Sequence, residues 1–241
     1  AVHSFKDLPT RPREGLVVTA VCRRRYPEDC VLARTPADSL DALGAGARVG
    51  TSSLRRGAQL RHLRGDLELV PIRGNVPTRI GKLHDGDLDA IVLARAGIER
   101  LGLAAEISFV FDPHRFLPAP AQGALAVQTR CDDTVTNEIV ATLDDPSTRA
   151  ATDAEREVLT AMKCGCHAPV GAYAEVAGDE MVLEAFIAEP NGRRLLRSRM
   201  AGPSAKPHEL GQKVARDLRD AGGKEILDEL ERDRDKGDGT T

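Results

Sequence analysis

Two cysteines flank a single glycine in the last third of the chain, and a histidine and a proline follow. The stretch reads MKCGCHAPVG and covers residues 162–171, with thiols at Cys164 and Cys166. A zinc site is disfavoured because no second cysteine or histidine pair follows at chelating spacing. The C-x-C spacing also differs from the C-x-x-C of redox centres. A nucleophilic or covalently modified cysteine has some local support, while a disulfide half or a small apolar residue in a turn stays open.

Arginines cluster between residues 48 and 79, although the chain as a whole is acidic. The formal net charge is −3, whereas this segment holds seven arginines against two acids and so carries a local charge of +5. The favoured explanation for the overall excess of 27 Arg over 7 Lys is the codon preference of a GC-rich genome, but the guanidinium fork also suits carboxylates and phosphates. The local excess predicts a cationic pocket.

The first arginine pair follows a run of small hydroxyl residues at the end of an expected strand. In VGTSSLRRGAQL (49–60), a helix begins after the serines and carries Arg55 and Arg56 in its first turn. Free N–H groups at a helix start attract anions, whereas cations are unfavourable there. An anionic ligand would offset this misplacement. The equally weighted alternative is that both arginines are solvated surface residues.

A second segment, IRGNVPTRI (72–80), repeats this arrangement. A strand ends at Ile72, and the next helix carries Arg79, with Pro77 near the first helical position that proline prefers. The carboxyl ends of neighbouring strands in a doubly wound sheet face one crevice, so both arginine sets are expected in one cleft. Two such sites fit a ligand with several carboxylates, and the lack of a P-loop or G-x-G-x-x-G pattern disfavours a nucleotide.

A lysine and an acid stand together in HSFKDLP (3–9). Asp7 before Leu8-Pro9 could simply cap a turn, which is the interpretation that the local sequence favours. In a cationic cleft, this carboxylate could instead hold a ligand N–H and stabilise a developing cation.

Strands and short helices alternate through the first half of the chain. Strands are expected at 15–22, 31–33, 67–72 and 88–94, and a further strand should end at 48–51. Helices are expected near 38–43, 52–63, 76–84 and 96–102. This alternation predicts a parallel, doubly wound sheet. The breaker-rich RFLPAPAQG (115–123) marks a crossing between domains.

The remaining sequence predicts a different architecture. A strand at 124–130 and a helix from about 134 precede a long helix at 145–165, with Ser147 or Thr148 as its N-cap. Strands at 169–176, 181–188 and 194–200 follow, with a Pro-Asn-Gly turn at 189–192. Helices at 206–221 and 223–232 precede a frayed polar tail.

These segments together resemble the hydroxymethylbilane synthase (porphobilinogen deaminase) family. The matching stretches are AVHSFKDLPT (1–10), GTSSLRRGAQL (50–60), IRGNVPTR (72–79), LDAIVLARAGIERLG (88–102), LPAPAQGALAVQ (117–128) and AERE…GCHAPVGAYA (154–174). Their order and spacing match the family over nearly the whole chain. The resemblance implies an α/β fold with two periplasmic-binding-protein-like doubly wound domains and a small α+β domain with a three-stranded sheet. The expected domains are 1–22 with 117–141 (an incomplete first domain), 23–116 and 142–241.

The resemblance also implies the chemistry. Four porphobilinogen molecules would condense stepwise, each losing ammonia, onto a dipyrromethane cofactor attached to Cys166 by a thioether, and water would release hydroxymethylbilane. Asp7 and Lys6 would be the catalytic residues, and no metal, flavin or nucleotide would be needed. The cofactor- and carboxylate-binding positions implied are Thr51, Ser52, Ser53, Arg55, Arg56, Arg73, Asn75, Arg79, Gln122 and Gly123.

One departure from the family lies at the start of the chain. Members carry several tens of residues before the HSxKD segment, so we expect either a piece of a longer molecule or a chain of very low activity. No leader or apolar run long enough to span a membrane is visible. We therefore expect a cytoplasmic protein with reduced thiols and with no nucleic-acid or membrane partner. The resemblance to the family implies a monomer. The alternative function is a non-catalytic two-domain clamp for an anionic small molecule, which leaves GCHAP and HSFKD unexplained.

Overall fold

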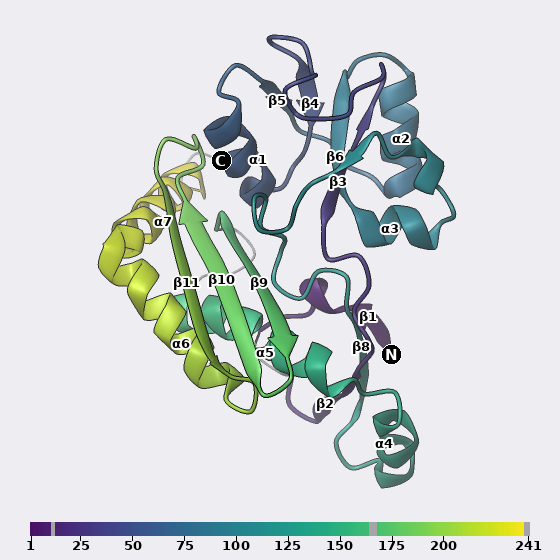
Figure 1. Ribbon diagram of the computed structural model, residues 1–241, viewed down its shortest axis with the longest axis vertical. Coiled ribbons are helices and arrows are strands. Elements are labelled where there is room, and N and C mark those ends of the chain that lie inside the picture. The colour runs from purple at the N-terminus through teal and green to yellow at the C-terminus, as the bar shows by residue number, and fades with distance from the viewer. Residues whose placement is uncertain (11–12, 164–167, 239–241) are drawn as a thin grey trace.

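Three separate β-sheets organise the computed structural model of this protein, which describes residues 1–10, 13–163 and 168–238. Figure 1 shows a five-stranded sheet with helices on both sides, a small three-stranded sheet beside the N-terminus, and a second three-stranded sheet flanked by long helices. Two segments connect the five-stranded sheet to the small sheet. We call them the first crossing (residues 22–28) and the second crossing (residues 111–124). They lie side by side, joined by the backbone hydrogen bond that Arg25 N donates to Gly123 O.

The five-stranded sheet is mixed. Its strands are β3 (Asp29–Ala33), β4 (Arg48–Gly50), β5 (Glu68–Val70), β6 (Ala90–Ala94) and β7 (Phe109–Val110), in the order β5-β4-β6-β3-β7. Strand β4 is parallel to β5 and β6, but β3 is antiparallel to β6 and β7. The prediction of a wholly parallel sheet is therefore wrong for β3. This strand enters directly from the first crossing, with no crossover helix before it, and so it runs away from the end at which β4, β5 and β6 finish.

Helices cover both faces of this sheet, as a doubly wound arrangement requires. Helix α1 (Leu54–Leu63) follows β4 and packs Leu60 against one face, while α2 (Val76–His84) and α3 (Arg95–Arg100) cover the other. The helix predicted near 38–43 is wrong, because these residues form bends and turns. So short a segment between Pro36 and Gly44 cannot offset the cost of nucleating a helix.

The small sheet carries the predicted catalytic segment. Its strands are β1 (Val2–Ser4), β8 (Leu125–Arg130) and β2 (Leu16–Val21), with β8 antiparallel to both neighbours. A single 3₁₀ turn, η1 (Phe5–Asp7), follows β1 and buries Phe5 against Val21 and Ala126. Helix α4 (Thr134–Ala141) packs on β2 and β8 and leaves Val135 and Ile139 more than two-thirds exposed. This sheet has much the smallest core of the three.

The third sheet is antiparallel, in the order β11-β10-β9. Its strands are β9 (Val170–Ala177), β10 (Glu180–Ala188) and β11 (Leu195–Pro203), and the predicted turn between the last two forms with Gly192 at φ +73°. Helices α5 (Pro146–Met162) and α6 (Pro207–Leu218) pack on it, and a short turn, η3 (Arg219–Gly223), leads into α7 (Lys224–Asp238).

Two predictions about these helices are wrong. The side chain that caps α5 is Asp145, which accepts from Thr148 N, rather than Ser147 or Thr148. Asp145 precedes Pro146, and proline favours the first helical position. Helix α7 also continues to Asp238, into the segment expected to be frayed from Arg232, of which residues 239–241 lie outside the described residues. Up to Lys236 this segment has no glycine or proline, the two residues that most disfavour a helix interior.

Candidate functional site

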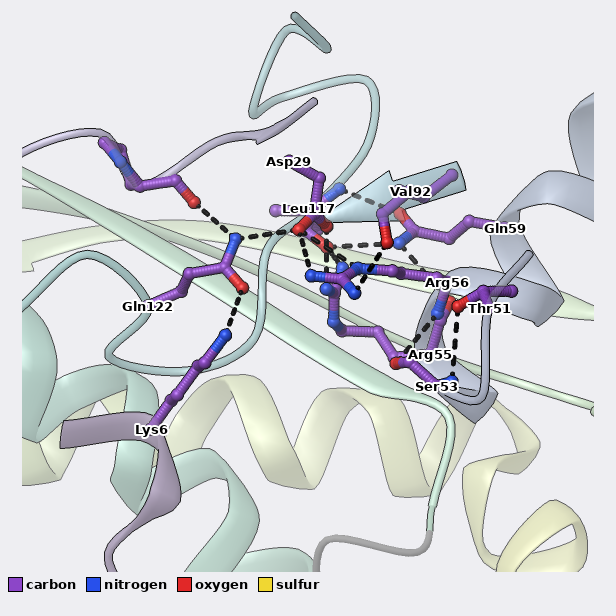
Figure 2. A network of polar contacts seen from close by, with 11 residues as sticks. Lys6, Asp29, Thr51, Ser53, Arg55, Arg56, Gln59, Val92, Leu117 and Gln122 are labelled. Carbon is purple, nitrogen blue, oxygen red and sulfur yellow. Dashed lines mark hydrogen bonds and ion pairs between the residues drawn. The ribbon is translucent and has the colours of Figure 1, made fainter. Parts of the chain in front are cut away.

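A fully buried carboxylate, Asp29, lies at the centre of the region where the crossings meet the five-stranded sheet. Its two oxygens accept from the guanidinium of Arg55 at 2.7 Å and from that of Arg56 at 2.8 Å, as Figure 2 shows. Asp29 is the first residue of β3 and pairs with Ala94, the last residue of β6. The antiparallel direction of β3 therefore brings this carboxylate to the end of the sheet at which α1 begins.

Helix α1 presents two arginines in its first turn because of how it starts. Ser53 caps the helix by accepting from Arg56 N. Arg55 and Arg56 are 5% and 7% exposed, so the alternative that they are solvated surface residues is wrong. The anion that offsets their unfavourable place at a helix N-terminus is Asp29 of the same chain. Burial alone would raise the pKa of Asp29, but the two guanidiniums hold it well below its ordinary value.

The two arginines are also fixed through backbone carbonyls. Arg55 donates to Leu117 O at 2.6 Å and Arg56 to Val92 O at 3.0 Å. Gln59 secures the same point of the second crossing, donating to Leu117 O and accepting from Leu117 N. The guanidiniums are thus held in place by the fold, with N–H groups left over for a ligand because each carries five.

Gln122 links this buried cluster to the small sheet. Its amide nitrogen donates to Asp29 Oδ1 at 3.0 Å and to Pro27 O at 2.8 Å, and its amide oxygen accepts from Lys6 Nζ at 3.2 Å (Figure 2). The next residue, Gly123, has φ +86°, and a Cβ there would lie 2.5 Å from Arg25 O on the first crossing. Only glycine fits this close approach of the two crossings.

The 3₁₀ turn η1 brings Lys6 and Asp7 to the same region. Lys6 is half-buried, and Asp7 is exposed. Burial, with the neighbouring positive charge of Arg56, lowers the pKa of Lys6 to about 8, against the opposing influence of Asp29 and Asp7.

Two cavities adjoin this network and share Lys6, Arg56 and Gln122. The first, which we call the α2–α3 cavity, has a volume of about 380 Å³ and lies between the small sheet and the starts of α2 and α3. Its cationic lining residues are Lys6, Arg56, Arg79 and Arg100, and none of its described lining residues is acidic.

The second, which we call the α1–α5 cavity, has a volume of about 410 Å³ and lies where all three sheets meet. Its lining includes Lys6, Asp7, Arg55 and Arg56, together with Leu159 of α5, Ala168 and the first residue of β9, Val170. Both volumes lie in the range of ordinary ligand sites.

The predicted polar residues of α1 and α2 mostly make local contacts. Ser52 bonds both the N–H and the carbonyl of Ile72, and Thr51 accepts from Ser53 N. Asn75 caps α2 by accepting from Thr78 N at 2.9 Å. Ser52 and Ser53 line the α1–α5 cavity, and Asn75 lines the α2–α3 cavity.

The two arginines predicted around α2 differ in position. Arg79 lines the α2–α3 cavity and donates to Gly74 O at 2.7 Å, and its pKa is lowered by burial and by Arg56. Arg73 is exposed and lines neither of these two cavities.

Sequence reasoning missed the acids that organise the site. Asp29 and Glu155 are both fully buried, and Glu155 on α5 accepts from Arg24, Ala121 N and Ala174 N. It therefore ties both crossings to the third sheet. A signal was present in each case, because Asp29 opens an apolar run and Glu155 lies between Ala151 and Val158 on the apolar face of α5.

The predicted cofactor-bearing Cys166, together with Cys164, lies outside the described residues. Among the described residues, Cys22, Cys30 and Cys131 are free thiols, and burial raises the pKa of Cys30 to about 12. No group of three or more histidine, cysteine, aspartate or glutamate side chains in this part of the chain is placed to hold a metal ion. None of the described helices combines the length and apolar character needed to cross a membrane.

Comparison with known proteins gives matches along nearly the whole chain. Residues 1–138 match the family model described as porphobilinogen deaminase, dipyromethane cofactor binding domain, and residues 150–220 match the porphobilinogen deaminase C-terminal domain. Similar proteins include the porphobilinogen deaminases of Syntrophobacter fumaroxidans (42% identity, covering 96% of this chain and 75% of the relative) and Stenotrophomonas maltophilia strain R551-3 (47%, 94% and 75%). The porphobilinogen deaminase of Nocardia farcinica is 45% identical, covering 95% of this chain and 69% of the relative.

Among solved structures, an arginine-specific periplasmic binding protein of Salmonella typhimurium is similar to part of this protein, and the alignment covers 54% of this chain and 59% of the Salmonella chain. The TM-score is 0.35 and the identity is 14%.

Proposed function

The chain belongs to the porphobilinogen deaminase family, and we propose that its reaction takes place where the α2–α3 and α1–α5 cavities share Lys6, Arg56 and Gln122. The activity is that of a hydroxymethylbilane synthase, a transferase of tetrapyrrole biosynthesis. It joins four porphobilinogen molecules with loss of ammonia. The observation that carries the proposed location is the meeting of cationic side chains from four elements, η1, α1, α2 and α3, around two adjoining cavities.

The described residues fit the dipyrromethane cofactor of the family. Each pyrrole of such a group carries an acetate and a propionate, so two pyrroles bring four negative charges. The α2–α3 cavity offers four cations without an acid among its described lining residues, and the α1–α5 cavity adds Arg55 against the single acid Asp7. When bound, the dipyrromethane supplies the primer that the substrate units extend.

We assign carboxylate binding to the cations of both cavities. Arg56 reaches both and is held by Asp29, so it needs no reorganisation when a ligand arrives. Arg79 and Lys6 are only half-buried, and their positive charges face the same space. The other predicted positions would hold the cofactor and the substrate in place, and they are Arg55, Thr51, Ser52, Ser53, Asn75, Gln122 and Gly123. Arg73 would lie at the rim, one residue before Gly74.

We assign the chemical role to Asp7. Its carboxylate lines the α1–α5 cavity, beside Lys6 and Arg56. There it would accept a hydrogen bond from a substrate pyrrole N–H, stabilise the positive charge that develops as ammonia leaves, and take up the proton released when the new bond forms. Lys6, with its pKa near 8, would keep the neighbouring substrate carboxylate in place at neutral pH.

The finer expectations about cell location, assembly and domains also remain proposals. Free thiols at Cys22, Cys30 and Cys131 are consistent with the reducing cytoplasm. We propose a monomer that takes porphobilinogen as its substrate and has no nucleic-acid or membrane partner. We also propose that the three sheets mark three domains, formed by 1–22 with 117–141, by 23–116 and by 142–241. Light scattering of the purified protein would test the monomer.

The proposed thioether at Cys166 is the sharpest test of the function. Ala168, two residues later in the sequence, lines the α1–α5 cavity. We expect the intact mass to exceed that of the bare chain by a two-pyrrole adduct, and peptide mapping to place it on Cys166. Cys166→Ser should abolish the adduct and the consumption of porphobilinogen, whereas the matched variant Cys164→Ser should keep both. An unmodified chain that binds porphobilinogen without consuming it would support the clamp instead.

A further inference from the structure

One arginine of α5 holds the turn that carries Lys6 and Asp7. The guanidinium of Arg156 donates to Phe5 O at 3.1 Å, to Leu8 O at 3.0 Å and to Pro9 O at 2.5 Å. It also lies over the ring of Phe5, 4.3 Å from the ring centroid. Three carbonyls of one short backbone segment thus converge on one planar fork, a geometry that suits Arg rather than Lys.

Within the described part of the chain, the turn has one other backbone anchor, on its opposite side. Phe5 N donates to Ala124 O at the start of β8, while Leu8 N only closes the turn on Phe5 O at 3.3 Å. Behind the turn lies an open cavity of about 730 Å³, lined by Phe5, Leu8, Pro9 and Arg156 among others. Phe5 is itself buried against Val21 and Ala126, and on the cavity side the guanidinium of Arg156 holds the backbone of the turn.

The neighbouring residue on α5 holds the other partner of Lys6. Glu155 accepts from Ala121 N at 2.6 Å and so fixes the residue next to Gln122. Gln122 in turn accepts from Lys6 Nζ at 3.2 Å. Successive residues of one helix thus position both sides of the Lys6–Gln122 contact, and movement of the turn against α5 would break it.

We propose that Arg156 is a positioning residue for the reaction, which fixes Lys6 and Asp7 at the cavities through the backbone of residues 5–9. This inference rests on the catalytic role proposed for that turn. Arg156 is not among the described lining residues of either the α2–α3 or the α1–α5 cavity, so through these contacts it acts on the substrate by way of Lys6 and Asp7.

Arg156→Lys is the decisive variant, because it keeps the charge and loses the fork. A lysine reaches at most part of the carbonyl set, so the turn should shift and loosen. We expect kcat to fall by about 10- to 100-fold, the range expected when a reacting group is displaced by about 1 Å. KM should rise by less, about threefold, because only Lys6 among the cations that bind the substrate moves with the turn, while Arg55, Arg56 and Arg79 are untouched.

Arg149→Lys is the matched control on the same helix. Arg149 also donates to backbone carbonyls, those of Val18 and Thr19, and it pairs with Asp144. Its contacts lie on β2 rather than on the catalytic turn, so we expect a comparable loss of thermal stability with kcat unchanged. Arg156→Gln provides a second substitution at the same position, should the lysine variant fail to fold.

A readout independent of activity comes from amide hydrogen exchange at Leu8. Arg156→Lys or Arg156→Gln should accelerate this exchange by at least about tenfold, a change that corresponds to about 1.4 kcal/mol in the opening equilibrium, while Arg149→Lys should leave it at the parent rate. The mass adduct on Cys166 should be retained in all folded variants. Unchanged kcat and unchanged Leu8 exchange in a folded Arg156 variant would overturn the positioning role. An inactive parent chain without an adduct would instead contradict the proposed function, and Leu8 exchange would still decide whether Arg156 holds the turn.

Discussion

The N-termini of α1 and α2 begin with the same local chemistry and reach different environments. Each helix follows a strand of the parallel part of the sheet, and each is capped by a polar side chain, Ser53 in α1 and Asn75 in α2. Each also carries arginine in its first turns. In α1 the pair is buried on Asp29, whereas in α2 Arg79 is half-buried and donates to the carbonyl of Gly74.

A carboxylate from a distant strand makes the difference. Asp29 reaches α1 because β3 runs against β6 and begins where α1 begins. The α1 arginines therefore form a fixed charge, built into the protein before any ligand binds. The cavity of Arg79 has no acid among its described lining residues. Arg79 is therefore more available to a ligand carboxylate than the two arginines of α1.

Removing the buried carboxylate should have the largest effect. Asp29→Asn keeps the shape and leaves Arg55 and Arg56 buried without their counter-charge, so we expect a loss of about 3–5 kcal/mol in the free energy of unfolding. The pKa of Asp29 is lowered in the folded state, so its contribution is present above about pH 4 and is lost as the pH falls further. Urea denaturation at pH 7 would measure the loss.

The ion pair of Arg48 with Glu68, in which both side chains are exposed, provides the control for this variant. Glu68→Gln should shift the urea midpoint little, since solvent-exposed pairs contribute little. If Asp29→Asn unfolded at the same urea concentration as the parent, the result would contradict the claim that Asp29 fixes the arginines of α1, and these would no longer differ from Arg79.

An effect of intermediate size is expected at α2. Arg79→Met removes a cation from the α2–α3 cavity, and we expect KM for porphobilinogen to rise about tenfold, which corresponds to the loss of one charge-assisted hydrogen bond. Arg73→Met should raise KM less, because Arg73 is exposed and lines neither cavity. Steady-state kinetics at low ionic strength would compare them, and equal effects would contradict the different positions assigned to the two arginines.

The smallest effect concerns how the fixed charge of Arg56 acts on Lys6. Burial and Arg56 lower the pKa of Lys6 to about 8, so Lys6 loses its positive charge as the pH rises through 8, and KM for the anionic substrate should rise there. Lys6→Arg keeps its proton and should abolish that rise, with little change at pH 7. Lys82→Arg, at an exposed position on α2, should behave as the parent. A KM that stays flat well above the pKa assigned to Lys6 in the parent would contradict that assignment.

Much of the fold could be predicted because its signals are local. The small hydroxyl residues before α1, Pro77 at the start of α2 and the Pro-Asn-Gly turn after β10 each specify an element through neighbouring residues. The helix expected near 38–43 is not formed, and α7 runs to Asp238 where a frayed tail was expected from Arg232, because short-range propensity is a weak guide at segment ends.

The sequence by itself determined which residue types are present: an arginine-rich segment, an HSFKD turn and a family membership carried by motifs along the chain. Only the tertiary structure decided which charges meet. Asp29 and Arg56 are 27 residues apart, and Arg156 and Phe5 are 151 apart. Such pairings depend on strand direction and on packing between sheets, and no local pattern encodes either, because a buried charge is stabilised by whichever partner the whole fold brings to it.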